Sequence, residues 1–302
     1  MTSAASICVI MPTLALPERA SMLRDAVASV RTQRGVRVKI LLVVNGNRFD
    51  VGLVRSFENS ADVQLVRLAL ADLPAALRAG REHVDSEWFA ELDDDDLLLP
   101  DTLTTRLEAA QVSADCDAVV SNGIVVEGGQ RRLHVVSWKD VKQDPLRALM
   151  QTNWLRPGAG LFRTAAVTAE MLHGMPHHLE WTYLALRLAL VCRLRFLEQP
   201  GFIYHGDTVD SQSKSRDYLL DQPHAIDSLL ALDLPGDVRR SFDRRRTAAC
   251  NAASRAHLRD RALGEAWRWH LQTLRNRGGW RYLPGTRRLL WALMLRQRAR
   301  TS

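Results

Sequence analysis

The segment FAELDDDDLLLP, at residues 89–100, places four consecutive carboxylates between an apolar run and an apolar turn that ends at a proline. Like charges packed this tightly repel one another. Their placement is explained when a divalent cation and its phosphate ligands share the site, because hard cations take carboxylate oxygens. The alternative is a solvated acidic turn that caps the helix after Pro100 through the helix dipole. Four aspartates exceed what capping needs, so the segment predicts a metal and phosphate site.

Short apolar runs alternate with amphipathic helical stretches around this segment. We expect strands at 7–11, 40–44, 63–68 and 88–92, and helices at 22–30, 73–84 and from 101 or 102 onward. This alternation is typical of an α/β fold, with a mostly parallel central sheet covered by helices. The aspartates then follow the carboxyl end of a strand, which is where open α/β sheets bind ligands.

The second half of the chain has a different pattern. We expect a strand at 118–120, a hairpin turn within 123–129 returning through 133–136, a tight loop at 158–160, a helix at 179–191 and a strand at 202–204. Beyond Tyr218 the remainder is predicted to be helical. The predicted domains are 1–213, divided into parts 1–122 and 123–213, and a basic helical extension over 214–302.

Composition and cysteine usage indicate a globular protein of the cytoplasm. The chain has 302 residues, of which 46% are hydrophobic and 25% are charged, an ordinary balance for a folded domain. Its four cysteines form no CxxC pair and lie mostly in apolar surroundings, which favours reduced core thiols over a disulfide framework. The apolar run at 7–11 lacks a preceding basic region and is interpreted as a strand rather than a secretion signal.

Charge is concentrated at the end of the chain. From Arg239 onward the sequence has 17 arginines against Asp243, Asp260 and Glu265. Residues 280–300 form a basic amphipathic helical pattern. Such a tail either meets an anionic surface such as phospholipid headgroups, at the inner face of the membrane, or packs on the body with its arginines in water. A nucleic-acid partner is not expected, because no recognised binding module accompanies the arginines.

The segment at 89–100 resembles the DxD segment of family 2 glycosyltransferases, which have the GT-A fold. Five further segments resemble that family's opening strand, nucleotide loop, first helix, second strand end and later helix, in this order: VIMPT at 9–13, PER at 17–19, LRDAVASV at 23–30, VVNGN at 43–47 and AALRAG at 75–80. Weaker matches continue to residue 213. The resemblance implies a Rossmann-like nucleotide-diphospho-sugar transferase that uses Mn²⁺ or Mg²⁺. Its acceptor would be a glycan, a lipid-linked saccharide or a protein-linked glycan.

The resemblance also implies roles for individual donor-side residues. Pro12, Thr13 and Asn45 would border the nucleoside pocket, Asp93 and Asp94 would approach ribose and phosphate, and Asp95 would bind the cation. Arg78 is either a phosphate contact or a solvated helix charge. His205, in the family's closing segment, either contacts metal or diphosphate or has a structural role.

On the acceptor side, an inverting transfer needs a carboxylate that takes the proton of the acceptor hydroxyl. Glu180 is the candidate base, since HLEWTYLALRLA at 178–189 resembles the family segment where a Glu-Asp pair opens a helix. Trp181 stands where the family has that aspartate. Trp154 and Gly158 either line the acceptor site, together with Trp181, or belong to the core.

Two rival functions remain open at this point. One is a catalytically degenerate scaffold or nucleotide-binding protein at the membrane surface, which is suggested by the departures from the family pattern at Trp181, Asn45, Leu77 and Arg78. A nucleotidyl- or phosphotransferase would also use an aspartate cluster, but the sequence contains no GxxxxGK[ST] loop and no GxGxxG turn.

Overall fold

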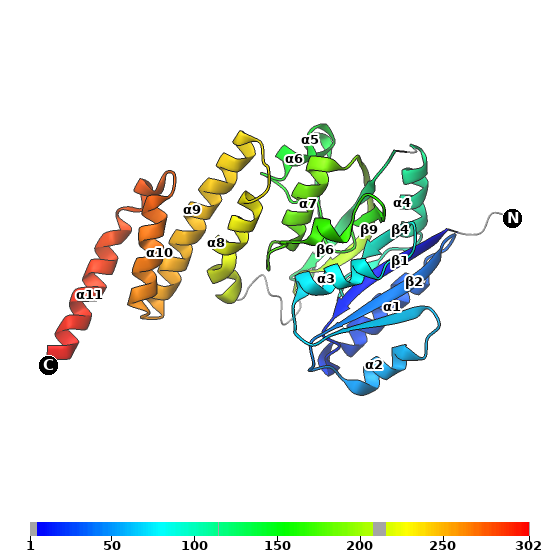
Figure 1. Cartoon of the computed structure of the whole chain (residues 1–302), viewed down its shortest axis with the longest axis horizontal. Coiled ribbons are helices and arrows are strands. Elements are labelled where there is room, and N and C mark those ends of the chain that lie inside the picture. The colour runs from blue at the N-terminus through cyan, green and yellow to red at the C-terminus, as the bar shows by residue number, and fades with distance from the viewer. Residues whose placement is uncertain (1–4, 114, 208–215, 302) are drawn as a thin grey trace. The chain divides into compact units, whose positions relative to one another are not determined.

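The computed structural model describes residues 5–113, 115–207 and 216–301, with the side chains of 296–301 left out. The chain forms two compact units, and Figure 1 shows the sheet of one and the helices of the other. The first comprises residues 1–175 and 180–209, and the second comprises 176–179 and 210–302. The predicted boundary at 213/214 lies outside the described residues.

The first unit is built on one mixed sheet, which has nine strands among the described residues. Its strand order is β3-β2-β1-β4-β8-β6-β9-β5, with β7 beside β6. The bounds are β1 Ser6–Thr13, β2 Arg37–Asn45, β3 Val63–Leu68, β4 Trp88–Glu91, β5 Leu97–Leu98, β6 Ala118–Glu127, β7 Gln130–Leu133, β8 Gly160–Arg163 and β9 Leu194–His205. Strands β1 to β4 are parallel to one another where they pair, and β6 is parallel to β9.

The parallel strands are apolar because both of their faces are covered. Residues 7–11 of β1 and 40–44 of β2 have no exposed surface, as continuous apolar runs of strand length predict. Helix α3 packs on both strands. A Cβ added at Gly80 of α3 would lie 2.4 Å from Ile10 Cγ2, so the glycine is what lets this helix approach β1 so closely.

The helices of the first unit are short and mostly begin with a clear local signal. Asp72 caps α3 by accepting a hydrogen bond from the backbone N–H of Ala75 at 2.8 Å, and Pro74 follows in the first turn. The bounds are η1 Pro17–Arg19, α1 Ala20–Arg31, α2 Val51–Glu58, α3 Leu73–Glu82, α4 Thr102–Gln111, α5 Lys139–Gln143, α6 Pro145–Ala148, η2 Ala169–Leu172 and α7 Glu180–Val191.

The predicted hairpin is present, with its turn at the end of the expected region 123–129, but its return strand β7 is Gln130–Leu133 instead of 133–136. Strand β6 continues through Gly123 as far as Glu127, and the turn is confined to Gly128 and Gly129, whose φ angles are +59° and +72°. Gly123 serves packing instead, because a Cβ there would lie 2.2 Å from Phe202 Cζ. A glycine inside a strand, which leaves room for an aromatic ring, cannot be told from a turn glycine by sequence alone.

The second unit is helical, with α8 at Arg216–Leu230, α9 at Gly236–Arg259, α10 at Leu263–Arg275, η4 at Gly279–Tyr282 and α11 at Gly285–Thr301. One small core contains Cys250, Ala253 and Trp269, and another contains Leu263, Ala266 and Leu289. None of the helices in the described part of the chain combines the length and apolarity required to span a bilayer. The predicted α/β architecture with a C-terminal helical extension is confirmed.

Candidate active site

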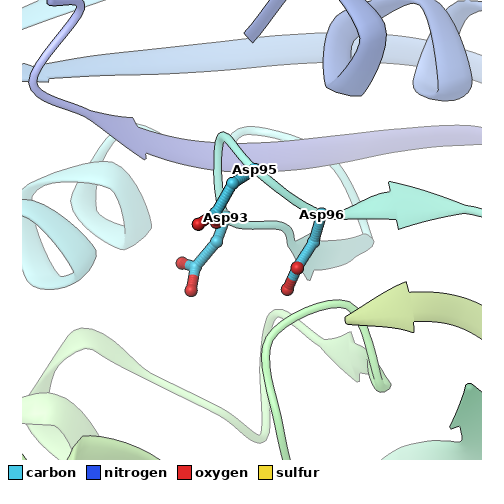
Figure 2. A group of neighbouring side chains, drawn as sticks. All are labelled: Asp93, Asp95 and Asp96. Carbon is cyan, nitrogen blue, oxygen red and sulfur yellow. The ribbon is translucent and has the colours of Figure 1, made fainter. Parts of the chain in front are cut away.

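The acidic loop at 93–96 leaves the buried strand β4 and leads into β5. Figure 2 shows the carboxylates of Asp93, Asp95 and Asp96 on the same side of this loop. One oxygen from each carboxylate lies within 4.8 Å of the others. The end of a buried parallel strand thus holds three anionic groups together, in a spacing that one metal ion can bridge.

The chemistry of this triad fits a hard divalent cation. Asp96 Oδ1 accepts a hydrogen bond from the backbone N–H of His205 at 2.9 Å, but Oδ2 is buried without a hydrogen-bond partner among the described residues. Burial and the neighbouring carboxylates raise the pKa of both Asp93 and Asp96 well above the usual range. A buried anionic oxygen without a partner is unfavourable, and Mg²⁺ or Mn²⁺ would satisfy it.

Asp94 makes different contacts from the triad. Thr13 donates a hydrogen bond from Oγ1 to Asp94 Oδ2 at 2.6 Å, and the guanidinium of Arg19 pairs with both Asp94 and Asp95. These contacts join the end of β1 and the following η1 to the acidic loop. The carboxylate of Asp94 therefore holds the loop after β1, and it is already engaged by a hydroxyl and a guanidinium.

His205 lies at the end of β9, against the backbone of the acidic loop. Its ring Nδ1 is 2.6 Å from the carbonyl oxygen of Asp95, and its backbone N–H donates to Asp96. The candidate metal triad does not include His205. In this geometry the histidine supports the loop that carries the candidate metal triad.

The expected nucleoside-pocket residues gather at the same sheet edge as the aspartates. Pro12 and Thr13 are in register with Val43 and Val44 on the parallel neighbour β2, which ends at Asn45. Asn45 Oδ1 accepts a hydrogen bond from the backbone N–H of Asp72 at 2.8 Å, so it also fixes the loop before α3.

Arg78 occupies a different environment from these residues. Its side chain is 45% exposed and lies 3.8 Å from Glu82, one turn later on α3. Of the two interpretations of Arg78, the structure favours the solvated helix charge, since surface pairs of this kind are weakly held.

Glu180 is the first residue of α7 and is buried. The pKa of Asp93 is raised mainly by burial and by the charges of Asp95 and Asp94. The charge of Glu180 raises it further. The structure thus brings a carboxylate from the second half of the sheet unit close to the acidic loop. Trp181 follows it and is partly buried.

Trp154 belongs to the core rather than to an acceptor surface. It has no exposed area, its Nε1 donates to the carbonyl oxygen of Pro145 at 2.8 Å, and its ring meets Phe196 edge-on at 5.3 Å between centroids. Neither face of the indole is open to a sugar. The expectation that Trp154 binds the acceptor is corrected accordingly.

Gly158 has a φ of +73° and lies directly beside the end of β4, which leads into the acidic loop. Its N–H donates to the carbonyl of Glu91 at 2.9 Å, and a Cβ here would lie 3.2 Å from Leu92 Cδ1. The absence of a side chain thus lets this loop pack against Glu91 and Leu92, just before the aspartate cluster.

Three residues near the cluster were given no individual role from the sequence. The guanidinium of Arg156 lies 4.5 Å from the ring centroid of Tyr204, its Nε donates to His134 Nδ1 at 3.1 Å, and its charge opposes the rise in the pKa of Asp96. Arg19 and Glu91 are the others. Burial raises the pKa of Glu91 to about 8, and both carboxylate oxygens lack hydrogen-bond partners in the described part of the chain.

An α/β sheet with an acidic loop at its parallel strand ends is the arrangement of a GT-A glycosyltransferase. Residues 8–167 match the family described as Glycosyl transferase family 2, and the chain belongs to that family. This confirms the resemblance noted in the sequence. Comparison with curated proteins gives no match.

Solved structures of TarS from S. aureus are similar to this chain. The complex of TarS 1-349 with UDP-GlcNAc has a TM-score of 0.57 and 13% sequence identity, over 82% of this chain and 72% of that chain. The complex with UDP has a TM-score of 0.52 and 15% identity, over 82% and 71% of the two chains. At these identities the likeness shows the fold, and it confirms the predicted GT-A architecture.

Proposed function

We propose that the protein transfers a sugar, with inversion, from a nucleotide-diphospho-sugar donor to a saccharide acceptor that is free, lipid-linked or protein-linked. The observation that carries this proposal is the triad Asp93, Asp95 and Asp96 at the strand ends of a family 2 glycosyltransferase. TarS, which shares the fold, has been captured with UDP-GlcNAc and with UDP. This supports a nucleotide-sugar donor here.

On the donor side, the sheet edge would hold the nucleoside and the acidic loop would hold the diphosphate. Pro12, Thr13 and Asn45 lie at the ends of β1 and β2, and the triad lies beyond β4. Mn²⁺ or Mg²⁺, when bound by the triad, offsets the negative charge that develops on the leaving nucleoside diphosphate. We assign residues 1–122 to donor binding and 123–213 to acceptor binding.

On the acceptor side, Glu180 is the proposed base. A buried carboxylate at the first residue of α7, within electrostatic reach of Asp93, suits a proton acceptor beside the reacting carbon. It would take the proton of the acceptor hydroxyl while that oxygen attacks the anomeric carbon. Helix α7 supplies a rigid support for this carboxylate.

We place the activity in the cytoplasm. The four cysteines are free, and burial raises the pKa of Cys8 to about 12 and that of Cys192 to about 11. Unpaired, protonated thiols are the usual state in a reducing compartment.

A second candidate function is a nucleotide-binding scaffold without turnover. It is favoured by Trp181, which stands where the family places an aspartate. One measurement distinguishes the two functions. It is the release of nucleoside diphosphate from a panel of nucleotide sugars, in the presence of Mn²⁺ and a mixture of saccharide acceptors. Catalytic release from one donor is expected of the transferase. Binding of that donor without release would support the scaffold.

A further inference from the structure

Large apolar side chains are exposed at the end of the second unit. Trp280 on η4 is 69% exposed, and Trp291 and Met294 on α11 are 62% and 54% exposed. Leu283, Leu290, Leu293 and Leu295 in the same segment are also exposed. A soluble protein seldom leaves so many large apolar side chains of one segment in water, and such groups of side chains mark interaction surfaces.

The geometry of α11 separates these side chains from the ones that hold the helix in place. Leu289 is 2% exposed and packs with Leu263 and Ala266. With 3.6 residues per turn, Leu290, Trp291, Met294 and Leu295 project to the sides and back of the helix, away from Leu289. The exposed residues therefore lie on a different side of α11 from Leu289 and are not part of the core of the second unit.

Positive charge lies on the same surface. Arg287 and Arg288 are exposed, and Arg287 stands one turn before Trp291 on the outward side of α11. The guanidinium of Arg281 lies 5.8 Å from the ring centroid of Trp280. From Ala266 to the end of the sequence there are nine arginines and no aspartate or glutamate. Basic and apolar groups are thus interleaved, not sorted onto separate sides.

We infer that this C-terminal patch, defined by Trp280, Leu283, Arg287, Arg288, Leu290, Trp291, Met294 and Leu295, docks on the surface of an anionic lipid bilayer. Arginines pair with lipid phosphates while their alkyl stems lie along apolar surface, and tryptophan favours the boundary between headgroups and acyl chains. Leucine and methionine side chains enter the apolar layer below. A bilayer surface is the one partner that offers both an anionic and an apolar layer over the whole patch.

Other partners complement only part of the patch. A nucleic acid would pair with the arginines but leave Leu290, Met294 and Leu295 in water. A second copy would bury the apolar side chains but would bring two arginine-rich segments together, and like charges in close contact are unfavourable. The inference does not depend on the transfer chemistry. If the proposed function holds, docking would bring the enzyme to a lipid-linked acceptor.

The test is co-sedimentation of the full chain with vesicles of phosphatidylcholine alone and of phosphatidylcholine with phosphatidylglycerol. We expect binding to the anionic vesicles that weakens as salt is added, and little binding to the neutral ones. Arg287→Gln combined with Arg288→Gln should weaken anionic binding by at least about tenfold. Trp291→Gln combined with Met294→Gln should weaken it by a similar factor.

The matched controls are Arg131→Gln and Val191→Gln, which change an exposed arginine and an exposed apolar residue of the first unit. Both should bind vesicles like the parent. Unchanged thermal unfolding of every variant excludes a loss of fold. The inference is overturned by equal binding to neutral vesicles, by anionic binding that both double variants retain, or by no vesicle binding together with self-association or nucleic-acid binding that the double variants abolish.

Discussion

The guanidinium of Arg19 lies 3.1 Å from the carboxylate of Asp95, measured from Nη2 to Oδ2. The same nitrogen also pairs with Asp94, and all three side chains are largely buried. Arg19 therefore places a fixed positive charge beside Asp95, one of the three carboxylates of the candidate metal triad. Any cation that enters the triad shares the Asp95 carboxylate with this guanidinium.

Replacement of Arg19 should strengthen metal binding in the absence of nucleotide. Arg19→Gln removes a positive charge near Asp95, so Mn²⁺ should bind the variant more tightly by about tenfold, which corresponds to about 1.4 kcal/mol of lost charge repulsion. Titration calorimetry with Mn²⁺ alone measures this. Arg31→Gln, which breaks the exposed pair with Asp62, is the control and should bind like the parent. Weaker Mn²⁺ binding by Arg19→Gln would mean that Arg19 holds Asp95 in its metal-binding position.

Glu180→Gln should retain donor binding and lose transfer. The amide keeps the size of the side chain but cannot take a proton from the acceptor, and loss of a general base typically lowers a rate by about 10²- to 10⁴-fold. Nucleoside diphosphate binding and transfer rate are to be measured on the same preparation. Glu170→Gln makes the same change at an exposed glutamate of η2 and is the control, which should transfer sugar like the parent. A Glu180→Gln variant that transfers sugar at nearly the parental rate would remove Glu180 from the mechanism.

Glu91 should make the fold less stable as pH rises. Burial raises its pKa from 4.5 to about 8 in the folded state. The folded state then binds this proton more strongly than the unfolded state, so the free energy of unfolding falls as pH increases from about 4.5 to about 8. Glu91→Gln lacks this titration and should be the more stable protein at pH 8 by several kcal/mol, since one pKa unit is worth about 1.4 kcal/mol.

Urea unfolding in EDTA across this pH range measures the effect of Glu91. The difference between variant and parent is the relevant quantity, because the neighbouring aspartates titrate in both proteins. Glu87→Gln, which changes an exposed glutamate just before β4, is the control. Its difference from the parent in free energy of unfolding should not change with pH over this range. Parallel stability curves for Glu91→Gln and the parent would show that Glu91 is not held in its protonated form.

The sequence predicted the parts of this site that local chemistry determines. Continuous apolar runs identified β1 and β2, and the aspartate cluster marked the end of β4. The contacts of Arg19 and Arg156 were not predicted because they involve residues that are distant in sequence: Arg19 and Asp94 are 75 positions apart. The short strand β8 was missed because its glycine-rich start resembles a loop, and Trp154 looked equally suited to core and surface.

Arg106 should be essential for stability, although nothing in the sequence singled it out. It is completely buried on α4, and its guanidinium donates hydrogen bonds to Ser121 Oγ and to the backbone carbonyls of Gly158 and Gly160. Arg106→Met fills a similar volume but leaves those acceptors without a donor. We expect a loss of roughly 3 kcal/mol in the free energy of unfolding.

Urea denaturation compares Arg106→Met with Arg55→Met, which changes an exposed arginine of α2. The Arg55 variant should stay within about 0.5 kcal/mol of the parent. Equal stability of the Arg106 variant and the parent would mean that the carbonyls find other donors, and that Arg106 does not fix the loop at 158–160.

The central claim is that the carboxylates of Asp93, Asp95 and Asp96 hold a divalent cation that binds the diphosphate of the donor. Calorimetry with UDP, GDP, dTDP and CDP, in Mn²⁺ and again in EDTA, tests it on the parent and on Asp95→Asn. We predict that one nucleoside diphosphate binds with Mn²⁺, that EDTA abolishes its binding, and that Asp95→Asn weakens it at least about tenfold. Binding that is equally tight in EDTA and unchanged in Asp95→Asn would contradict the account.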